Sequence, residues 1–232
     1  MIRAVVFVPW RPQPSRVAAF ERLIAWYAAE LPDWEVRTID TGDVPFNLAA
    51  CRNAAFTGRA DDDIVILNDA DTIPERAPLL DAVSAAAEDD LVHLPYTEYR
   101  WLGAVGSGQY AEGTALADCD HEVVRGACSG VYVSSARSWR GHGGQDERFR
   151  GWGYEDAAWY LAHGTLLGAH PARHEGRVYA LHHVPEVRAG AQYDANAALM
   201  DRYRAASDSP EAMRALIAEP ARASNALAGP AS

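Results

Sequence analysis

The amino-acid sequence predicts a single α/β domain, with αβα layers around a mostly parallel mixed sheet. Short apolar runs of strand length alternate along the chain with segments whose apolar residues recur every three or four positions, as in amphipathic helices. At 232 residues, of which 49% are hydrophobic, the chain can bury one sizeable core. It is short for two independent domains, so we expect one.

The first predicted unit is a strand, a helix and a second strand. Residues 2–8 form a continuous apolar run that ends at Pro9, which is typical of a fully buried strand in a parallel sheet. The apolar residues of the next segment have helical spacing over residues 20–31, and Pro32 ends that pattern. Residues 34–39 are expected to form the second strand.

The same alternation continues through the middle of the chain. A helix is predicted over residues 46–56, followed by a strand over residues 64–67 that leads into Asn68-Asp69-Ala70-Asp71. A further helix over residues 79–87 and a short strand over residues 91–94 complete this part.

Periodicity is lost after Pro95, and we expect the glycine-rich residues 103–113 to form a mobile loop over a site. A strand resumes at residues 131–133. A helix is predicted over residues 156–163, with Gly164 closing it at the C′ position.

The last predicted elements are a strand over residues 178–181 and a helix over residues 189–206. The Ala, Ser and Pro content beyond residue 207 indicates a loosely packed tail. The expected organisation is therefore one domain over residues 1–206 and a tail over residues 207–232.

Composition excludes several classes of protein. No apolar run approaches the roughly 20 residues of a membrane helix, and residues 2–8 are too short for a secretory signal, so we expect a cytoplasmic protein without a membrane partner. The three cysteines contain no C-x-x-C pair, which argues against a disulfide framework and a thiolate zinc site. The net charge of −11 disfavours nucleic-acid binding over the whole surface. Residues 121–190, with 8 Arg against 7 acids, leave room for a local phosphate-binding face.

Asp69 and Asp71 follow a predicted buried strand. Because α/β sheets bind ligands at the carboxyl ends of their strands, a D-x-D sequence here suits a hard divalent cation. One carboxylate would bind the metal and the other the ribose or sugar, with diphosphate oxygens completing the coordination shell. The alternative is that the two acids only begin a solvated turn before Pro74.

A second group of candidate residues is Gly151-Trp152-Gly153-Tyr154-Glu155-Asp156, in which two acids open a helix. The helix dipole and the free amides stabilise carboxylates there as anions, and an ionised carboxylate can accept a proton from a hydroxyl group. Alternatively, the acids are helix caps and Trp152 is a core residue. His182 and His183, at another predicted strand end, offer an imidazole ligand, although a lone histidine is often structural.

Four segments together resemble the GT-A fold glycosyltransferases of the β-1,4-galactosyltransferase and polypeptide N-acetylgalactosaminyltransferase type. The resemblance covers residues 2–184 in the order of that family. The matching residues are Pro9-Trp10-Arg11 for the family's Pro-aromatic-Arg, Phe46-Asn47-x-Ala49 with Asn53 and Phe56 for its Phe-Asn-x-Ala helix, Asp69-Ala70-Asp71-Thr72-Ile73-Pro74 for its D-x-D-x-x-P, and Ser129-Gly130-Val131 with Phe149-Arg150-Gly151-Trp152-Gly153-Tyr154-Glu155-Asp156 for its Gly-Gly-Val strand and G-W-G-x-E-D.

The resemblance implies metal-dependent transfer of a sugar from a nucleoside-diphosphate donor, a UDP-sugar, to an acceptor hydroxyl, with Mn²⁺ or Mg²⁺ as cofactor and inversion at the anomeric carbon. Asp71 with His182 or His183 would bind the metal, and Asp156 would be the base. The remaining residues would bind donor or acceptor: Pro9, Arg11, Phe46, Asn47 and Asn53 the nucleotide, Asp69 the ribose or sugar, and Trp152 and Glu155 the sugar and acceptor.

The sequence also departs from that family. Tyr179 or Ala180 stands where inverting members have a Met three residues before the metal-binding His, and Leu48 replaces an Arg that some members use on the donor. The acceptor is a glycan, a protein side chain, a small metabolite or a hydroxylated base in DNA. The DNA option arises because compact enzymes of this kind also resemble phage glycosyltransferases that modify hydroxymethylated pyrimidines. No partner protein is implied.

Two other classes of protein stay open at this point. A nucleotidyltransferase could use the same D-x-D, but the sequence has neither a glycine-rich phosphate loop with a following lysine nor any lysine at all. A non-catalytic sugar-binding module would use Trp101, Trp139 and Trp152 as stacking platforms and would have no need of a metal-linked diphosphate site.

Overall fold

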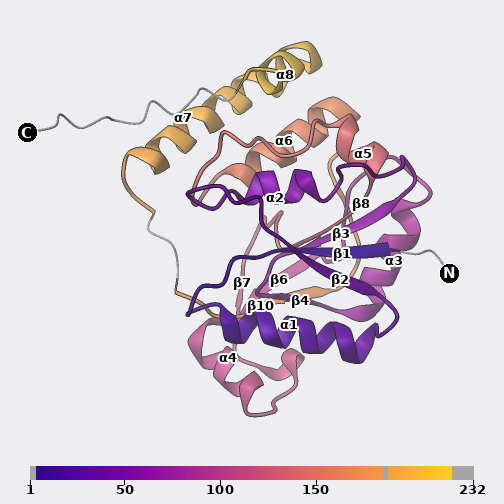
Figure 1. Cartoon of the computed structure of the whole chain (residues 1–232), viewed down its shortest axis with the longest axis vertical. Helices are drawn as coiled ribbons and strands as arrows, with labels where there is room; N and C mark the ends of the chain where they lie inside the picture. Colours follow the sequence, from indigo (N-terminus) through magenta and orange to yellow (C-terminus); the bar gives the residue numbers. More distant parts are fainter. Residues whose placement is uncertain (1–3, 185–187, 221–232) are drawn as a thin grey trace, which may run out of the picture.

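The computed structural model describes residues 4–184 and 188–220. Figure 1 shows a central sheet with α1 on one side and α2, α5 and α6 on the other. The helices are α1 (Val17–Glu30), α2 (Leu48–Ala54), α3 (Arg76–Ala86), α4 (Gly103–Ala111), the 3-10 turn η1 (Leu116–Asp118), α5 (Ala136–Gly141), α6 (Glu155–Leu167), α7 (Ala191–Ala206) and α8 (Pro210–Ile217). The strands are β1 (Ala4–Pro9), β2 (Glu35–Ile39), β3 (Ile64–Asn68), β4 (Thr72–Pro74), β5 (His93–Leu94), β6 (Glu98–Trp101), β7 (Glu122–Val123), β8 (Val131–Ser135), β9 (Ala172–Arg173) and β10 (Arg177–Ala180).

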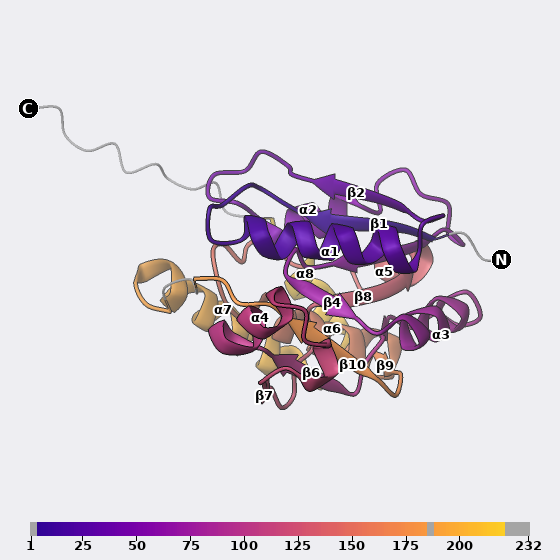
Figure 2. The same cartoon turned by 90° about the horizontal axis from the view of Figure 1, so that it is seen from below.

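The strands form two sheets. The larger has the order β2-β1-β3-β8-β5-β9, in which β1 is parallel to β2 and β3, and β8 is antiparallel to both of its neighbours. The smaller has the order β4-β10-β6-β7 and lies below β1 and β2 in the view of Figure 2. The expected layered α/β architecture is confirmed.

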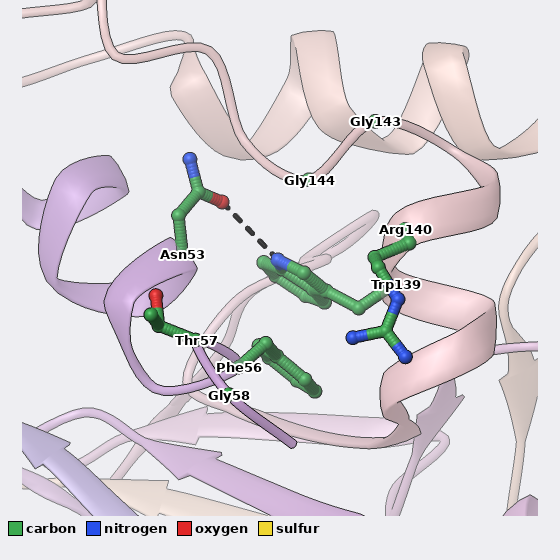
Figure 3. Close-up of a pocket in the computed structure, with 8 residues that line it drawn as sticks. All are labelled: Asn53, Phe56, Thr57, Gly58, Trp139, Arg140, Gly143 and Gly144. Carbon is green, nitrogen blue, oxygen red and sulfur yellow. Dashed lines mark hydrogen bonds between the residues drawn. The ribbon is translucent and has the colours of Figure 1, made fainter. Parts of the chain in front are cut away.

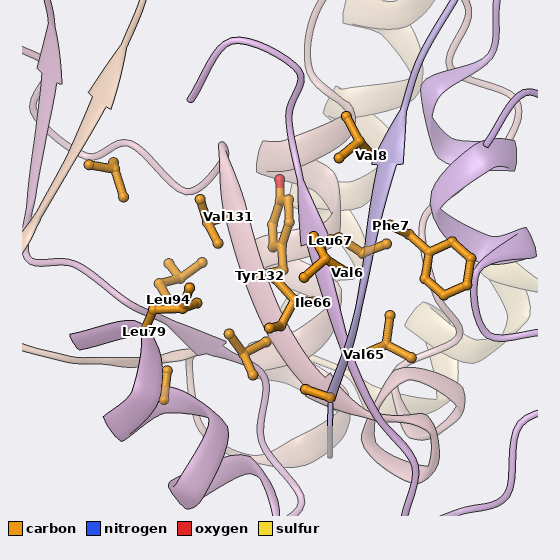
Figure 4. Packing of buried hydrophobic residues seen from close by; sticks show 14 of the residues in the cluster. Val6, Phe7, Val8, Val65, Ile66, Leu67, Leu79, Leu94, Val131 and Tyr132 are labelled. Carbon is orange, nitrogen blue, oxygen red and sulfur yellow. The ribbon is translucent and has the colours of Figure 1, made fainter. Parts of the chain in front are cut away.

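The core lies on both faces of β1 and β3. Val6, Val8, Ile66 and Leu67 are at most 1% exposed, because helices cover the two sides of the sheet, and this burial explains the continuous apolar runs (Figure 4). From α1, Tyr27 reaches into the core, and its hydroxyl donates a hydrogen bond of 2.7 Å to Asn68 Oδ1. That contact ties the helix to the end of β3, where the D-x-D sequence begins.

The glycine-rich residues 103–113 were expected to form a mobile loop, and this prediction is wrong. They form α4, in which Gly106 is buried against the Asp120 carbonyl group, so closely that a Cβ atom would lie 1.9 Å from that oxygen. The glycine therefore permits a close contact between backbones.

The expected end of the helix at Gly164 is also wrong. The ring of His170 packs where a Cβ atom of Gly164 would stand, and α6 continues until Gly168 ends it in the left-handed region at φ 72°.

The tail expected from residue 207 is in fact folded as far as α8. Ser209 caps this helix by accepting a hydrogen bond from Ala212 N, and Met213 and Leu216 are buried in a small cluster with α6 and α7. Three stretches lie outside the described residues: residues 221–232 of the expected tail, residues 2 and 3 of the expected first strand, and residues 185–187. None of the helices in the described part of the chain has the length and apolar character needed to cross a membrane.

Candidate active site

A pocket of about 360 Å³ opens where β1 and β3 end. This position agrees with the rule that α/β sheets bind ligands at the carboxyl ends of parallel strands. Nine of the predicted site residues line it, namely Pro9, Arg11, Phe46, Asp69, Asp71, Trp152, Glu155, Asp156 and His183; Trp10, Gln13, Arg16, Pro45, Leu48, Ala70, Tyr99, Ser129 and Gly151 complete the lining.

One end of the pocket is built on Arg11. Its Nε and Nη2 atoms donate hydrogen bonds of 2.8 and 2.6 Å to the two oxygens of Asp40, at the end of β2. This pair lowers the pKa of Asp40, mainly through the hydrogen bond from Arg11. The guanidinium also lies over the ring of Phe46, 5.2 Å from the centroid. Two planar groups are thus stacked at this part of the pocket, where a planar base can stack in turn.

Asn47 and Asn53, predicted to bind nucleotide, do not line this pocket. Asn47 caps α2 by accepting from Ala50 N, and its amide donates to Glu147 O at 3.1 Å. Asn53 Oδ1 accepts from Trp139 Nε1, as Figure 3 shows beside a separate cavity of about 420 Å³. Its amide donates to Gln145 O at 2.7 Å. Both side chains tie α2 to the segment before α6.

Asp71 and His183 are in direct contact where they line the pocket. Asp71 is 8% exposed, and its Oδ2 atom lies 3.0 Å from His183 Nε2 and 3.4 Å from Arg16 Nη1. His183 Nδ1 lies 2.8 Å from Val184 O, to which an Nδ1–H donates, so Nε2 is the nitrogen presented to the carboxylate. The hydrogen bond with Asp71 raises the pKa of His183.

His182 does not join this pair. It is exposed, and its backbone N–H donates to Ser107 Oγ of α4 at 2.8 Å. Within residues 4–184 and 188–220, no group of three or more His, Cys, Asp or Glu residues is placed to hold a metal ion on its own. A metal here would therefore take two protein ligands, Asp71 and His183, and would depend on the bound substrate for the rest.

The two acids at the start of α6 also line the pocket. The backbone before them is left-handed at three residues, with φ values of 66° at Gly151, 109° at Gly153 and 74° at Tyr154. Such a conformation is unusual for a tyrosine and is often found at functional sites. It turns the chain so that both Glu155 and Asp156 line the pocket.

The two acids have different surroundings. Burial, and then the charge of Asp156, raise the pKa of Glu155 to about 7. Asp156 instead accepts hydrogen bonds from Arg52 Nη1 at 2.8 Å and from Tyr132 Oη at 2.5 Å. Arg52 also donates to Asp69 Oδ1 at 2.7 Å. Burial raises the pKa of Asp69, although the Arg52 charge opposes that effect.

Trp152 stands at the rim of the pocket, 38% exposed. The Arg188 guanidinium lies 4.0 Å from its ring centroid, and Tyr193 of α7 stacks nearly parallel to it at 6.3 Å. These two contacts restrict the movement of the indole, and its exposed part is apolar surface that a ligand can contact.

Sequence reasoning missed Arg16, Arg52 and Tyr132. Arg16 and Arg52 had a weak signal, since each is a charge beside a predicted apolar helix face. Tyr132 in β8 had no such signal.

In the arginine-rich residues 121–190, five side chains pair with carboxylates, namely Arg137, Arg140, Arg148, Arg150 and Arg177.

Comparisons of the sequence found no matching model of a protein family and no matching curated protein. Solved structures do match the fold. A mutant of Drosophila β1,4-galactosyltransferase 7, in complex with manganese, UDP-Gal and xylobiose, is 14% identical at a TM-score of 0.51, over 84% of this chain and 79% of that one. GalNAc-T7 with UDP, GalNAc and Mn²⁺ is 8% identical at a TM-score of 0.58, over 92% of this chain and 54% of that one. The chain has the GT-A fold that the resemblance implied.

Proposed function

We propose that this chain is a metal-dependent glycosyltransferase, which moves a sugar from a nucleoside-diphosphate donor to an acceptor hydroxyl. The observation that carries the proposal is the pocket itself, whose lining brings together the contacting pair Asp71 and His183 and the two acids of α6. A metal-binding pair, a base and a nucleotide wall in one cavity are what this transfer requires. The GT-A fold alone would not imply it, because one fold supports many functions.

The donor fits the end of the pocket built on Arg11. The flat wall of Arg11 and Phe46 suits the base, and Asp40 fixes the arginine in position. A UDP-sugar is our preferred donor, and both solved structures described above hold uridine nucleotides, UDP-Gal in one and UDP in the other. Asp69 would contact the ribose or the sugar.

The residues present fit a divalent cation, Mn²⁺ or Mg²⁺. Asp71 offers a carboxylate oxygen and His183 offers Nε2, a mixed donor set that suits Mn²⁺ in particular. When bound, the cation would supply Lewis-acid stabilisation of the charge on the departing diphosphate. Arg16 lies beside the same carboxylate and would add positive charge on the leaving-group side.

The acids of α6 would serve the acceptor. The acceptor oxygen forms a bond to the anomeric carbon as the bond to the diphosphate breaks, and Asp156 takes the hydroxyl proton. Attack from the face opposite the leaving group inverts the configuration of the sugar. Glu155, whose pKa lies near 7, would bind the acceptor through a hydrogen bond.

A sugar hydroxyl is the acceptor that we favour among a glycan, a protein, a metabolite and a hydroxymethylated base in DNA. Trp152 lines the pocket with a partly exposed aromatic ring, against which a sugar ring can pack. The DNA option is less favoured, because five of the eight arginines in residues 121–190 already form ion pairs with carboxylates of this chain.

A thermal-shift screen of nucleotide sugars, with Mn²⁺ or with EDTA, tests the proposal. A bound donor should raise the melting temperature only when the metal is present, because a ligand stabilises the folded state that binds it. Asp71→Asn should abolish the shift, whereas Asp81→Asn, an exposed carboxylate of α3, should preserve it. Equal stabilisation with and without metal, or none by any donor, would contradict the proposal.

A further inference from the structure

Arg52 is a charged residue with no exposed surface, and it lies between two carboxylates of the pocket. Its Nη2 atom donates to Asp69 at 2.7 Å, and its Nη1 atom donates to Asp156 at 2.8 Å. These two acids come from separate motifs, one following β3 and the other at the start of α6. A single guanidinium from α2 therefore joins the D-x-D turn to the start of α6.

The guanidinium is itself held from two further directions. Its Nη1 atom also donates to Gln145 Oε1 at 2.8 Å, and its carbon lies 4.8 Å from the ring centroid of Tyr132. An arginine presents its donors in a rigid planar fork, so several contacts fix its orientation as well as its position. A lysine in the same place could not donate parallel hydrogen bonds to both carboxylates.

Asp156 is oriented by two donors that meet on one of its oxygens. Arg52 Nη1 and Tyr132 Oη both reach Oδ1, at 2.8 and 2.5 Å. Within the described part of the chain, Oδ2 is thus the oxygen left to face the pocket. Tyr132 is fully buried and packs edge-on against Trp159, so its hydroxyl has little freedom to move.

A buried charge of this kind is costly to desolvate, and an apolar residue would often stabilise the fold as well or better. Arg52 also stands in a helix whose neighbouring residues Ala49, Ala50 and Cys51 are small and buried. Its placement is better explained by the arrangement of the pocket than by stability alone.

We propose that Arg52 and Tyr132 are positioning residues of the transfer reaction. Arg52 sets the separation of Asp69 and Asp156, and Tyr132 turns Asp156 so that Oδ2 faces the acceptor. This inference rests on the proposed glycosyltransferase function, and it assigns to the two residues no contact with substrate.

Tyr132→Phe removes only the hydroxyl group. We expect turnover, measured as donor hydrolysis or as transfer, to fall about tenfold or more, because a misdirected base is a less effective one. The affinity for UDP with Mn²⁺, measured by calorimetry, should stay within about twofold, since Asp71 and His183 are untouched. Such a split between turnover and binding would not follow from a loss of stability alone.

Tyr203→Phe is the matched control. Tyr203 is also buried, and its hydroxyl donates to Asp146 Oδ2 at 2.8 Å, away from the pocket in the cluster of α6, α7 and α8. This variant loses the same kind of bond, so it should melt at a lower temperature and keep its turnover and UDP affinity. If Tyr132→Phe lowers turnover no more than Tyr203→Phe does, the proposal is overturned.

Arg52→Lys keeps the charge but loses the fork, so both UDP affinity and turnover should fall. Crystal structures of Arg52→Lys and Tyr132→Phe provide a readout that does not depend on activity. The proposal requires the Asp156 carboxylate to turn or to adopt several orientations in them. An unchanged carboxylate in both variants would overturn it, even if the wild-type protein transferred no sugar. Absence of metal-dependent donor binding in the wild type would instead reject the proposed function.

Discussion

His183 Nε2 lies 3.0 Å from Asp71 Oδ2, although the two residues come from different halves of the chain. Strand pairing brings them together. β10 runs antiparallel to β4, and Leu181 N donates to Asp71 O at 2.7 Å, so the chain that leaves β10 passes beside the D-x-D turn. Because Nδ1 of His183 donates to Val184 O, the other ring nitrogen, Nε2, is the one that lies beside the carboxylate of Asp71. The predictions about metal binding follow from this geometry.

His183→Ala and His182→Ala should behave very differently. The first removes one of two protein ligands and should weaken Mn²⁺-dependent UDP binding by at least tenfold, whereas the second removes an exposed side chain and should leave binding unchanged. Calorimetric titration of UDP at fixed Mn²⁺ measures both. Equal and mild effects of the two substitutions would show that neither histidine is a ligand.

Asp156→Asn and Glu155→Gln should separate the base from its neighbour. Asn keeps the size and polarity of Asp but cannot take a proton, so Asp156→Asn should lower turnover about a hundredfold while donor affinity hardly changes. A helix cap would behave differently, because Asn caps about as well as Asp. If Glu155→Gln abolishes turnover and Asp156→Asn does not, the base is Glu155.

Glu155 also predicts a pH dependence. Its pKa is raised from 4.5 to about 7, so the side chain is neutral below that pH and ionised above it. We expect turnover to change across a transition near pH 7, and we expect Glu155→Gln to remove this transition, since Gln does not titrate. A pH profile of turnover for both proteins provides the measurement. If the transition persists in Glu155→Gln, it belongs to another titrating group.

The parts of the fold that the sequence predicted are those with a strong local signal. β1 and β3 are buried on both faces and therefore read as continuous apolar runs. β6 has no such pattern, since its residues are only partly buried, and the second sheet was missed with it. The helix α4 was missed because Gly106 was interpreted as flexibility, whereas close packing against Asp120 requires it.

The motifs of the site were predictable from the sequence, whereas the contacts between their side chains were not. Asp69, Asp71, Glu155 and Asp156 stood out because strand ends and helix starts are local features. The partnership of Arg52 with Asp69 and Asp156 depends on three elements meeting in space, which no local pattern encodes. The choice between His182 and His183 likewise depends on the path of the chain after β10, which ends at Ala180.

Met213→Ala tests whether α8 belongs to the folded domain. Met213 has no exposed surface and packs in the cluster with Phe149, Met200 and Tyr203. Its truncation should lower the free energy of unfolding by about 2–5 kcal/mol, as expected when a cavity is left in a core. Arg214→Ala, on the exposed side of the same helix, should cost far less. Chemical denaturation that gave equal small values for both would mean that α8 packs loosely.

Two buried histidines should make the fold sensitive to acid. His142 and His163 have no exposed surface, and burial lowers their pKa values from 6.5 to about 3 and about 4, respectively. His163 Nε2 accepts the Val92 N–H at 3.0 Å, and its Nδ1–H donates to Ala169 O at 2.8 Å, an arrangement that only the neutral ring can make. Protonation of Nε2 would break the bond to Val92.

The sign of the effect follows from these lowered pKa values. Below pH 6.5 the unfolded chain binds protons that the folded protein excludes, so the free energy of unfolding is fully retained above that pH and is lost as the pH falls toward 4. Each histidine should contribute up to about 1.4 kcal/mol per pH unit, or roughly 2 kcal/mol between pH 6.5 and 5.

His142→Phe keeps an aromatic ring against Trp139 and Trp159 but cannot titrate, so the free energy of unfolding of this variant should fall less steeply with pH in urea titrations over this range. His121→Asn, which replaces an exposed histidine, should keep the steep wild-type dependence. If the slopes of His142→Phe and the wild type coincide, His142 is protonated in the folded protein and the aromatic cluster accommodates its charge.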